Sequence, residues 1–382
     1  MRLPPTERPH LLFLFSDTGG GHRSATEAIT EALRLEFGER FFISMIDIFK
    51  DYAPQPLDRM PDLYPKMVKA PKAWSLGFYL SDGHRRARLI TATTWPYVRR
   101  NAHALVSQNP CDLVVSVHPL ANAPILHALG RDRPEFVTVV TDLVTTHALW
   151  FHHRADLCVV PTEQAYQRAI DNGMEPEQVK VVGLPVADRF CQQNGDKQAL
   201  RARLGWPVDL PVILLVGGSE GMGPLERSAY AIASLELPAA LIIVTGRNHE
   251  LKRRLEAYPW PLPTHVYGFV DEMPDFMRAA DILVTKAGPS TISEAFIAGL
   301  PVALYSRVPG QEDGNVTYVT SEGAGVWAPH PDSLVKALRE WIEHPERREK
   351  AAENARRLSR PHAAREVAHL LASRVGVGQL SV

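Results

Sequence analysis

The sequence has little cysteine, no long apolar run and almost no net charge. Its three cysteines, Cys111, Cys158 and Cys191, are odd in number and widely spaced. We therefore predict neither a disulfide framework nor a structural zinc site. No apolar run approaches the roughly 18 residues that a membrane span needs. A net charge of −1 argues against a dedicated nucleic-acid binder. These features predict a protein of the reducing cytoplasm that reaches a membrane only by surface attachment.

Short apolar runs alternate with helical patterns along the whole chain. Such runs are typical of strands covered on both faces in a parallel sheet, and the intervening helices indicate right-handed βαβ units. The fold class predicted is therefore α/β. Strands are expected at 11–15, 41–46, 113–117, 136–141, 157–160 and 179–182 in the first half, and at 212–216, 240–244, 265–269, 282–285 and 302–305 in the second.

The length of 382 residues suits two domains. We predict two Rossmann-like domains whose parallel sheets face a central cleft and bind ligands at the strands' carboxyl ends. The first spans 1–186 and holds an insertion at about 50–103. Residues 187–208 form an interdomain linker, and 209–360 form the second domain. The last segment, 361–382, is expected to be a helix that packs back on the first domain.

A glycine-rich loop follows the first predicted strand. It reads Ser16-Asp-Thr-Gly-Gly-Gly-His-Arg-Ser-Ala25 and is not the GxGxxG dinucleotide fingerprint. Glycine lets the backbone approach a ligand, and His22 begins the next helix, whose dipole favours a neutral imidazole able to accept a proton. Asp17 either orients His22 or binds the acceptor, or it caps the turn. The alternative interpretation is a tight turn with a surface histidine.

A second turn, in the other half of the chain, favours binding of a nucleotide sugar. Gly288, Pro289, Ser290 and Thr291 connect a buried strand to a helix that carries Glu294. Free N–H groups at a helix start bind phosphate, and a carboxylate one turn further in accepts hydrogen bonds from ribose hydroxyls.

Four further strand ends supply candidate donor contacts, each with a structural alternative. Gly218 and Ser219 can contact the diphosphate, and Arg247 can reach phosphate or stay solvated. Phe269 and Val270 can contact the uracil edge or pack in the core. The amide of Gln311 and the carboxylate of Glu312 can hold sugar hydroxyls or form a polar turn.

The segment 50–103 combines positive charge with aromatic residues. Ten Lys or Arg stand against four Asp there, and Trp74 is one of several interleaved aromatic side chains. Such a mixture suits an anionic bilayer interface, and we predict that Lys66, Lys69 and Trp74 contact it. The alternative is a solvated helical excursion with a small core of its own.

Taken together, seven motifs resemble the family of monogalactosyldiacylglycerol synthases and processive diacylglycerol glucosyltransferases. Each motif is modest alone, but the ordered set covers nearly the whole chain. The motifs are Ser16-Asp-Thr-Gly-Gly-Gly-His-Arg-Ser-Ala25, Val117-His-Pro119, Thr138-Val-Val-Thr-Asp-Leu143 with Trp150-Phe-His152, Gly183-Leu-Pro-Val186, Gly217-Gly-Ser219, Lys286-Ala-Gly-Pro-Ser-Thr-Ile-Ser-Glu-Ala295 and Gln311-Glu-Asp-Gly-Asn315.

The resemblance implies a GT-B fold and an inverting transferase that moves a hexose from UDP-galactose or UDP-glucose to diacylglycerol at the cytoplasmic membrane leaflet. It implies His22 as base, with Asp142 and His147 in reserve, and the acceptor beside Gly20, Gly21 and His118. No bound cofactor or catalytic metal is expected, because the chain has no Asp-x-Asp motif. Two alternatives stay open, namely a UDP-sugar epimerase and a non-catalytic UDP-sugar sensor. The choice of hexose and the oligomeric state stay open as well.

One position departs from the family pattern. Relatives often carry a basic residue after the Gly-Leu-Pro-Val motif, where this chain has Ala187. A nucleotide contact at that position is therefore in doubt. The variant sequence Leu143-Val-Thr-Thr-His147 leaves the choice of donor sugar open.

Overall fold

The computed structural model describes residues 8–18, 20–67, 70–192, 195–218, 221 and 223–378, with the side chains of 65 and 66 excepted. The chain divides into two units. Unit 1 comprises residues 1–188, 308–311 and 361–382, and unit 2 comprises 189–307 and 312–360. Each unit contains one six-stranded sheet in which all paired strands are parallel. The predicted α/β class with two parallel sheets is confirmed.

The sheet of unit 1 has the strand order β2-β1-β3-β4-β5-β6. Its strands are β1 (His10–Phe15), β2 (Phe42–Asp47), β3 (Leu113–Ser116), β4 (Glu135–Val139), β5 (Leu157–Val160) and β6 (Val179–Val181). From β1 the chain moves to one neighbour, β2, and then returns to place β3 on the other side. The order therefore reverses between β1 and β3, which is where ligands bind in open α/β sheets.

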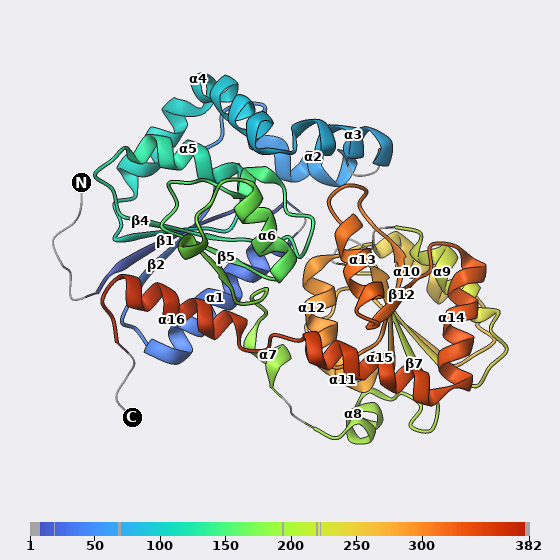
Figure 1. The fold of residues 1–382 in the computed structure, drawn as a ribbon. Helices are drawn as coiled ribbons and strands as arrows, with labels where there is room; N and C mark the ends of the chain where they lie inside the picture. Colours follow the sequence, from blue (N-terminus) through green and yellow to red (C-terminus); the bar gives the residue numbers. More distant parts are fainter. Residues whose placement is uncertain are drawn as a thin grey trace. The chain divides into compact units, whose positions relative to one another are not determined.

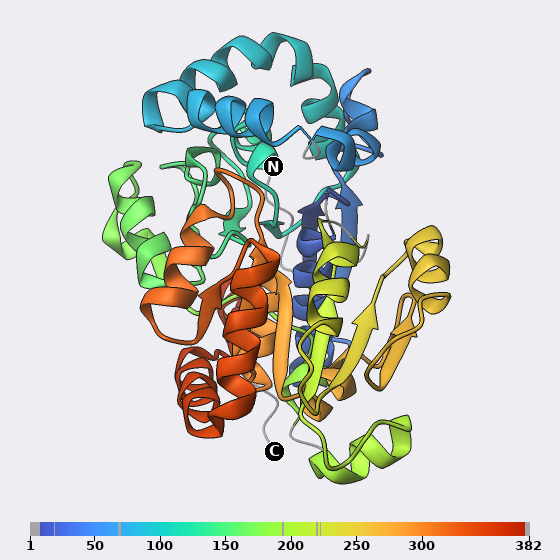
Figure 2. The same cartoon turned by 90° about the vertical axis from the view of Figure 1, so that its right-hand side faces the viewer.

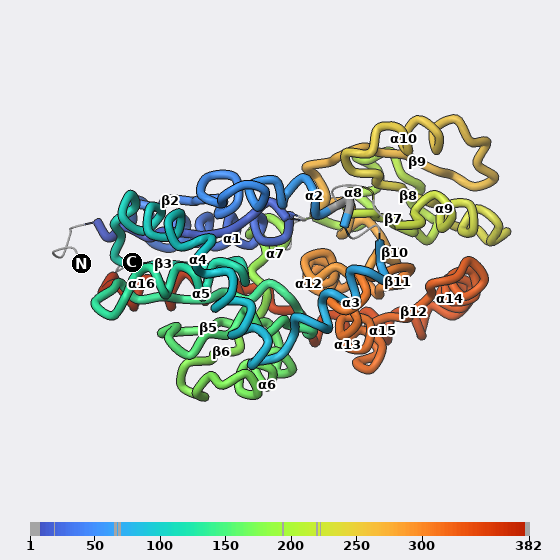
Figure 3. Tube along the Cα trace, turned by 90° about the horizontal axis from the view of Figure 1, so that it is seen from above, coloured from blue at the N-terminus to red at the C-terminus, as the bar shows by residue number. Residues whose placement is uncertain are grey.

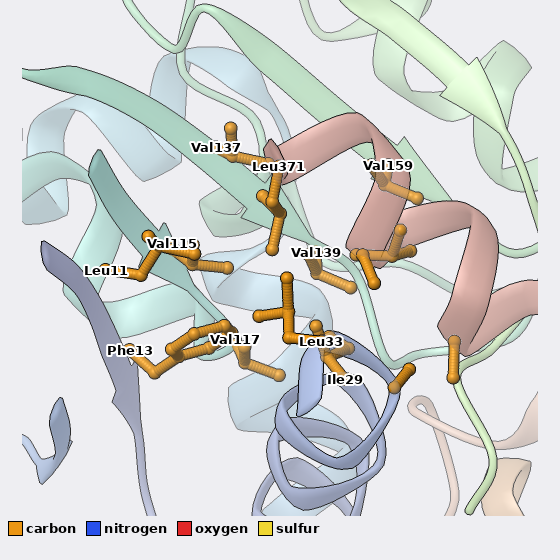
Figure 4. Packing of buried hydrophobic residues seen from close by; sticks show 14 of the residues in the cluster. Leu11, Phe13, Ile29, Leu33, Val115, Val117, Val137, Val139, Val159 and Leu371 are labelled. Atoms are coloured by element: carbon orange, nitrogen blue, oxygen red, sulfur yellow. The ribbon is translucent and has the colours of Figure 1, made fainter. Parts of the chain in front are cut away.

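Helices cover both faces of this sheet. They are α1 (Gly21–Phe37), α4 (His84–Gln108), α5 (Pro119–Leu129), α6 (Glu163–Asp171) and α16 (Ala363–Arg374). On one face Leu11 and Phe13 of β1 pack against Ile29 and Leu33 of α1 and Leu371 of α16 (Figure 4). The final helix thus shares a core with the first helix (Figure 1).

Alternate residues of the same strands point to the other face. Leu12 and Leu14 of β1 contribute to a second core, which Leu105 of α4 and Leu126 of α5 complete. Alternation along a strand explains why both faces of these short, apolar segments are buried.

The crossover from β2 to β3 includes the whole of the predicted insertion at about 50–103. It contains a 3-10 turn (Leu57–Arg59), α2 (Met60–Met67), α3 (Pro71–Ser81) and the 25-residue helix α4. Figure 3 follows the chain through these helices, in blue to teal. Two more 3-10 turns lie at Ala148–Trp150 and Pro176–Gln178.

The sheet of unit 2 has the order β12-β11-β10-β7-β8-β9, so its reversal point lies between β7 and β10. Figure 2 shows helices on both sides of these strands. The strands are β7 (Val212–Val216), β8 (Ala240–Val244), β9 (Thr264–Tyr267), β10 (Ile282–Lys286), β11 (Val302–Ser306) and β12 (Gly325–Trp327). The helices are α8 (Lys197–Leu204), α9 (Leu225–Ala233), α10 (His249–Glu256), α11 (Met273–Ala279), α12 (Pro289–Ile297), α13 (Asp313–Ser321), α14 (Pro331–Glu343) and α15 (Pro345–Leu358).

The segment 187–208 differs from the predicted linker. It contains α7 (Asp188–Cys191) and α8, and α8 is anchored to unit 2. The buried Arg201 guanidinium donates to the Ala279 carbonyl over 2.8 Å and forms an ion pair with Asp281. Arg201 therefore fastens α8 to residues of unit 2. The predicted boundaries also miss the return of 308–311 to unit 1.

Candidate active site in unit 1 and donor site in unit 2

The loop after β1 positions His22 at the reversal point of the first sheet. Gly20 adopts a left-handed conformation with φ of 79° and is the N-cap of α1. His22 is the second residue of α1. Its Nδ1 lies 2.8 Å from the hydroxyl of Thr141, which follows β4, and the backbone of Val117, which follows β3, also bonds the ring. Three strand ends therefore hold one imidazole.

Burial keeps this imidazole neutral. It lowers the pKa of His22 to about 4, against the partial opposition of the Val117 backbone bond. We expected the helix dipole to favour the neutral form as well, but the largest cause of the low pKa in the structure is burial of the ring. A neutral imidazole at pH 7 can accept a proton.

His118 lies beside His22, with ring centroids 4.6 Å apart. Its Nδ1 accepts from the Leu120 backbone N–H over 3.3 Å, so the hydrogen sits on Nε2, which is 3.2 Å from the Thr18 hydroxyl. Burial, and then the neighbouring His22, hold the pKa of His118 well below its usual value. His118 is the N-cap of α5 as well as a wall of the His22 environment.

Asp17 is engaged in ion pairs rather than with His22. Its carboxylate accepts from Arg23 through both oxygens and from Lys50 over 2.6 Å. The Arg23 hydrogen bond is the main reason that the pKa of Asp17 falls to about 2. In the described part of the chain no hydrogen bond joins Asp17 to His22. Asp17 thus fixes the start of α1 through its ion pair with Arg23. Gly21 is the first residue of this helix.

Asp142 lies one residue beyond Thr141 and is buried. Its Oδ2 accepts from the Trp150 indole over 2.6 Å, and its Oδ1 lies 3.3 Å from the side-chain amide nitrogen of Gln311. The Gln311 carbonyl oxygen in turn accepts from the Tyr64 hydroxyl over 3.3 Å. Gln311, predicted as a sugar ligand, is thus part of a hydrogen-bonded chain within unit 1.

His147 joins the crossover helices to the sheet. Its Nδ1 accepts from the Leu149 N–H and its Nε2 lies 3.0 Å from the Ser81 hydroxyl at the end of α3. The adjacent Asp82 accepts from the Ala148 N–H and from Arg168. His147 therefore anchors α3 to the loop that carries Asp142.

Two predicted membrane contacts lie outside the description. They are Lys69 and the side chain of Lys66. The half-buried Trp74 packs edge to face on Tyr64, with centroids 5.4 Å apart.

The ends of β7 and β10 are adjacent in unit 2 and bring the two predicted phosphate loops together. Gly218 follows β7 with φ of 72°, and Gly288 is the N-cap of α12. Lys286, the last residue of β10, lies next to both glycines. A Cβ at Gly288 would stand 2.8 Å from the Lys286 Nζ, and one at Gly218 would stand 3.8 Å from its Cε. Ser219 lies outside the described residues.

The start of α12 presents backbone donors beside this lysine. Pro289 occupies the first helical position, where a missing N–H costs nothing, and the N–H groups of Ser290 and Thr291 have no carbonyl partner within the helix. Glu294 lies one turn further along. Among the described residues it has no hydrogen bond or ion pair, and burial raises its pKa to about 8. This carboxyl group is available to sugar hydroxyls.

The remaining predicted donor contacts separate into two places. Arg247 stacks on the ring of Phe269, with the guanidinium carbon 4.8 Å from the ring centroid. Phe269 is 53% exposed, so it is not the core residue that the alternative interpretation required, and the half-buried Val270 follows it. Glu312 is buried and accepts from Lys286 over 2.6 Å, so its carboxylate already has a cationic partner.

Two residues with central positions in the structure had no predicted role. They are Thr141 and Lys286, and each lies in one of the seven motifs that resemble the family. Thr141 holds His22, and Lys286 supplies positive charge at the phosphate loops. Lys286 ends β10 and Thr141 lies two residues beyond β4, so both are polar residues at the carboxyl ends of strands, and that is the signal that identifies them. Among the described residues no group of three or more His, Cys, Asp or Glu side chains is arranged to hold a metal ion.

Comparison with known proteins agrees with this arrangement. A family model described as "Monogalactosyldiacylglycerol (MGDG) synthase" matches residues 22–186, and one described as "Glycosyl transferases group 1" matches 196–358. The chain is 38% identical over 366 residues to monogalactosyldiacylglycerol synthase 3, chloroplastic, of Arabidopsis thaliana, covering 92% of this chain and 78% of the relative. It is 37% identical over 379 residues to the chloroplastic synthase of Spinacia oleracea, covering 96% and 72%.

Solved structures show the same fold at low sequence identity. MurG of Acinetobacter baumannii has a TM-score of 0.62 at 16% identity, covering 96% of this chain and 99% of that one. The UDP-GlcNAc 2-epimerase of Neisseria meningitidis, bound to UDP-GlcNAc, has a TM-score of 0.62 at 15% identity, covering 95% and 100%. The two parallel sheets and these neighbours show a GT-B fold, and the two family models show that the protein is a glycosyltransferase. The chain belongs to the monogalactosyldiacylglycerol synthase family.

The relatives correct one prediction. We expected a cytoplasmic enzyme on the cytoplasmic membrane leaflet, but the synthases of Arabidopsis and Spinacia are named as chloroplastic. The prediction rested on reduced cysteines, which report a redox state that more than one compartment provides. Within the described ranges no helix is both long and apolar enough to cross a membrane.

Proposed function

We propose that this protein transfers galactose from UDP-galactose to diacylglycerol with inversion at the anomeric carbon. Family membership supports the reaction, and the names of the relatives favour galactose over glucose as the sugar. The proposed mechanism depends on the His22 imidazole. Residues at three strand ends hold this ring in place, and burial keeps it neutral.

The chemical step needs a base and a stabilised leaving group. The diacylglycerol hydroxyl attacks the anomeric carbon, its oxygen–carbon bond forms as the bond to the diphosphate breaks, and the hydroxyl proton passes to His22. UDP leaves with one additional negative charge. Thr141 keeps the imidazole in place for this transfer, and its hydrogen bond makes it a positioning residue.

The donor is assigned to unit 2. Ser290 and Thr291 offer N–H groups to the diphosphate, and Glu294 accepts from the ribose. Arg247 and Phe269 form a stacked pair whose exposed ring suits a base. Gly218, close to Lys286, leaves room for phosphate oxygens.

The acceptor is assigned to unit 1, with the crossover helices at the lipid surface. Leu76 and Leu80 of α3 are 61% and 63% exposed, and Leu89 of α4 is 64% exposed. Lys72 and Arg85 are exposed on the same two helices. Apolar side chains beside cations are typical of an anionic bilayer surface. We therefore include an anionic membrane among the partners.

The experiment is a transfer assay with labelled UDP-galactose or UDP-glucose, with and without vesicles containing diacylglycerol. Label transfer that requires the lipid and prefers UDP-galactose supports the proposal. Isomerisation of the donor without lipid would support an epimerase instead, and donor binding without turnover would support a sensor. The His22→Ala variant serves as control, because it should bind donor and fail to transfer.

A further inference from the structure

Lys286 and Glu312 form an ion pair at the reversal point of the second sheet. The Lys286 ammonium donates to the Glu312 Oε1 over 2.6 Å, and the side chains are 19% and 6% exposed. Removal of one partner from a pair this buried strongly destabilises the folded protein, because the other charge is left buried without a partner. An intact pair nevertheless contributes little more net stability than well-packed apolar residues would. The position of this pair at a sheet's ligand edge therefore calls for a functional explanation.

The strand pairing is irregular where Lys286 ends β10. Thr285 opposes Leu304 and Lys286 opposes Ser306, so β11 has one extra residue, Tyr305, between the two pairs. Irregularities of this kind are frequent beside active sites. The Lys286 ammonium lies against the Gly288 turn, with Gly218 of the neighbouring loop close to its Cε.

We infer that Lys286 contacts the diphosphate of the donor and stabilises the departing UDP, while Glu312 holds the ammonium in place until the donor arrives. An ammonium has three donor hydrogens, so it can keep one bond to Glu312 and give others to phosphate oxygens. Glu312 is then a positioning residue, in place of the sugar ligand that we predicted. This inference rests on the proposed function.

The charge balance of the reaction gives the lysine its kinetic role. When the anomeric carbon–oxygen bond breaks, its electron pair stays on the phosphate oxygen, and UDP carries one more negative charge than it did in the donor. A fixed cation beside that oxygen stabilises the transition state more than the ground state. Loss of the cation should therefore lower kcat as well as weaken binding.

The test is calorimetric titration of the full chain with UDP and with uridine, which lacks both phosphates. For Lys286→Met we expect UDP to bind about 10- to 100-fold more weakly, as for a lost charged hydrogen bond, with uridine affinity unchanged. Lys286→Arg should restore most of the UDP affinity. Lys350→Met, which removes an exposed lysine of α15, is the matched control.

Glu312→Gln separates a functional pair from a structural one. It removes a negative charge beside the phosphates, so UDP should bind at least as tightly as to the unaltered protein. A purely structural pair predicts that both variants lose stability and UDP affinity together. That outcome, or unchanged UDP affinity in Lys286→Met, overturns the inference. Failure of the unaltered protein to bind UDP and uridine would instead overturn the proposed donor site.

Discussion

Glu294 should make donor affinity depend on pH. Burial raises the pKa of this carboxyl group to about 8, so in the empty protein it is mostly protonated at pH 7. Ribose hydroxyls donate best to a carboxylate, and binding must then remove the proton. A site that binds only in its ionised form, with a pKa of about 8, binds about tenfold more tightly at pH 9 than at pH 7.

The same reasoning sets the size of the mutational effect. A hydrogen bond to a charged group contributes about 1.5–3 kcal/mol, and deprotonation at pH 7 offsets about 1.4 kcal/mol of it. We expect Glu294→Ala to weaken UDP-galactose binding by roughly 1 kcal/mol at pH 7, or about fivefold. At pH 9 the loss should grow to roughly 2 kcal/mol, or about thirtyfold.

Titration calorimetry at pH 7, 8 and 9 measures this directly, and UDP-galactose suits it because its diphosphate has no group that titrates in this range. Repetition in buffers of different ionisation enthalpy counts the protons released. Glu294→Gln should bind with no drift between pH 7 and 9, whereas Glu343→Gln on the exposed face of α14 should behave as the unaltered protein does. If the UDP-galactose affinity of the unaltered protein does not change between pH 7 and 9, binding does not require ionisation of Glu294.

Four further outcomes follow from the geometry of unit 1. His22→Ala should leave UDP-galactose affinity unchanged and lower kcat about 10²- to 10⁴-fold in the transfer assay, and near-normal turnover removes His22 from the mechanism. Thr141→Val should lower kcat about fivefold by loss of one hydrogen bond, and Thr141→Ser should restore it; equal activity in both variants contradicts a positioning role. Burial lowers the pKa of His22 from 6.5 to about 4 and that of His152 from 6.5 to about 3. As the pH falls, these histidines take up protons in the unfolded chain before they do so in the folded protein, so the folded protein should lose stability between pH 6.5 and 4. Thermal unfolding measures this loss, and a Tm that stays constant over that range contradicts the burial of the two rings. Leu76→Glu with Leu80→Glu should reduce co-sedimentation with anionic vesicles while calorimetry shows unchanged UDP binding, and equal sedimentation of the variant rules out these residues as membrane contacts.

The strands could be predicted from the sequence because they are buried on both faces. The expected strands 157–160, 212–216 and 240–244 coincide with β5, β7 and β8. The short edge strand β12 was missed, since Gly325–Trp327 offers three half-buried residues and no apolar run.

The site was harder to predict than the fold, because motif positions do not reveal side-chain partners. His22 and Glu294 lie where the strand ends placed them, and their roles stay predictions. The sequence left open whether Asp17 orients His22, binds the acceptor or caps the turn. In the structure its carboxylate bonds Arg23 and Lys50, respectively six and 33 positions away along the chain. Such distant pairings are set by tertiary packing, which residue spacing along the chain does not contain.

The position of α16 makes unit 1 depend on contacts between distant parts of the chain. Val367 and Leu371 cover the face of the first sheet beside α1, although most of unit 2 lies between them and β6 in the sequence. Residues 189–360, apart from the short segment 308–311, form unit 2 without such a return of the chain. Contacts between residues far apart in sequence require closure of a long loop, so the core that α1 and α16 share should form more slowly than the core of unit 2.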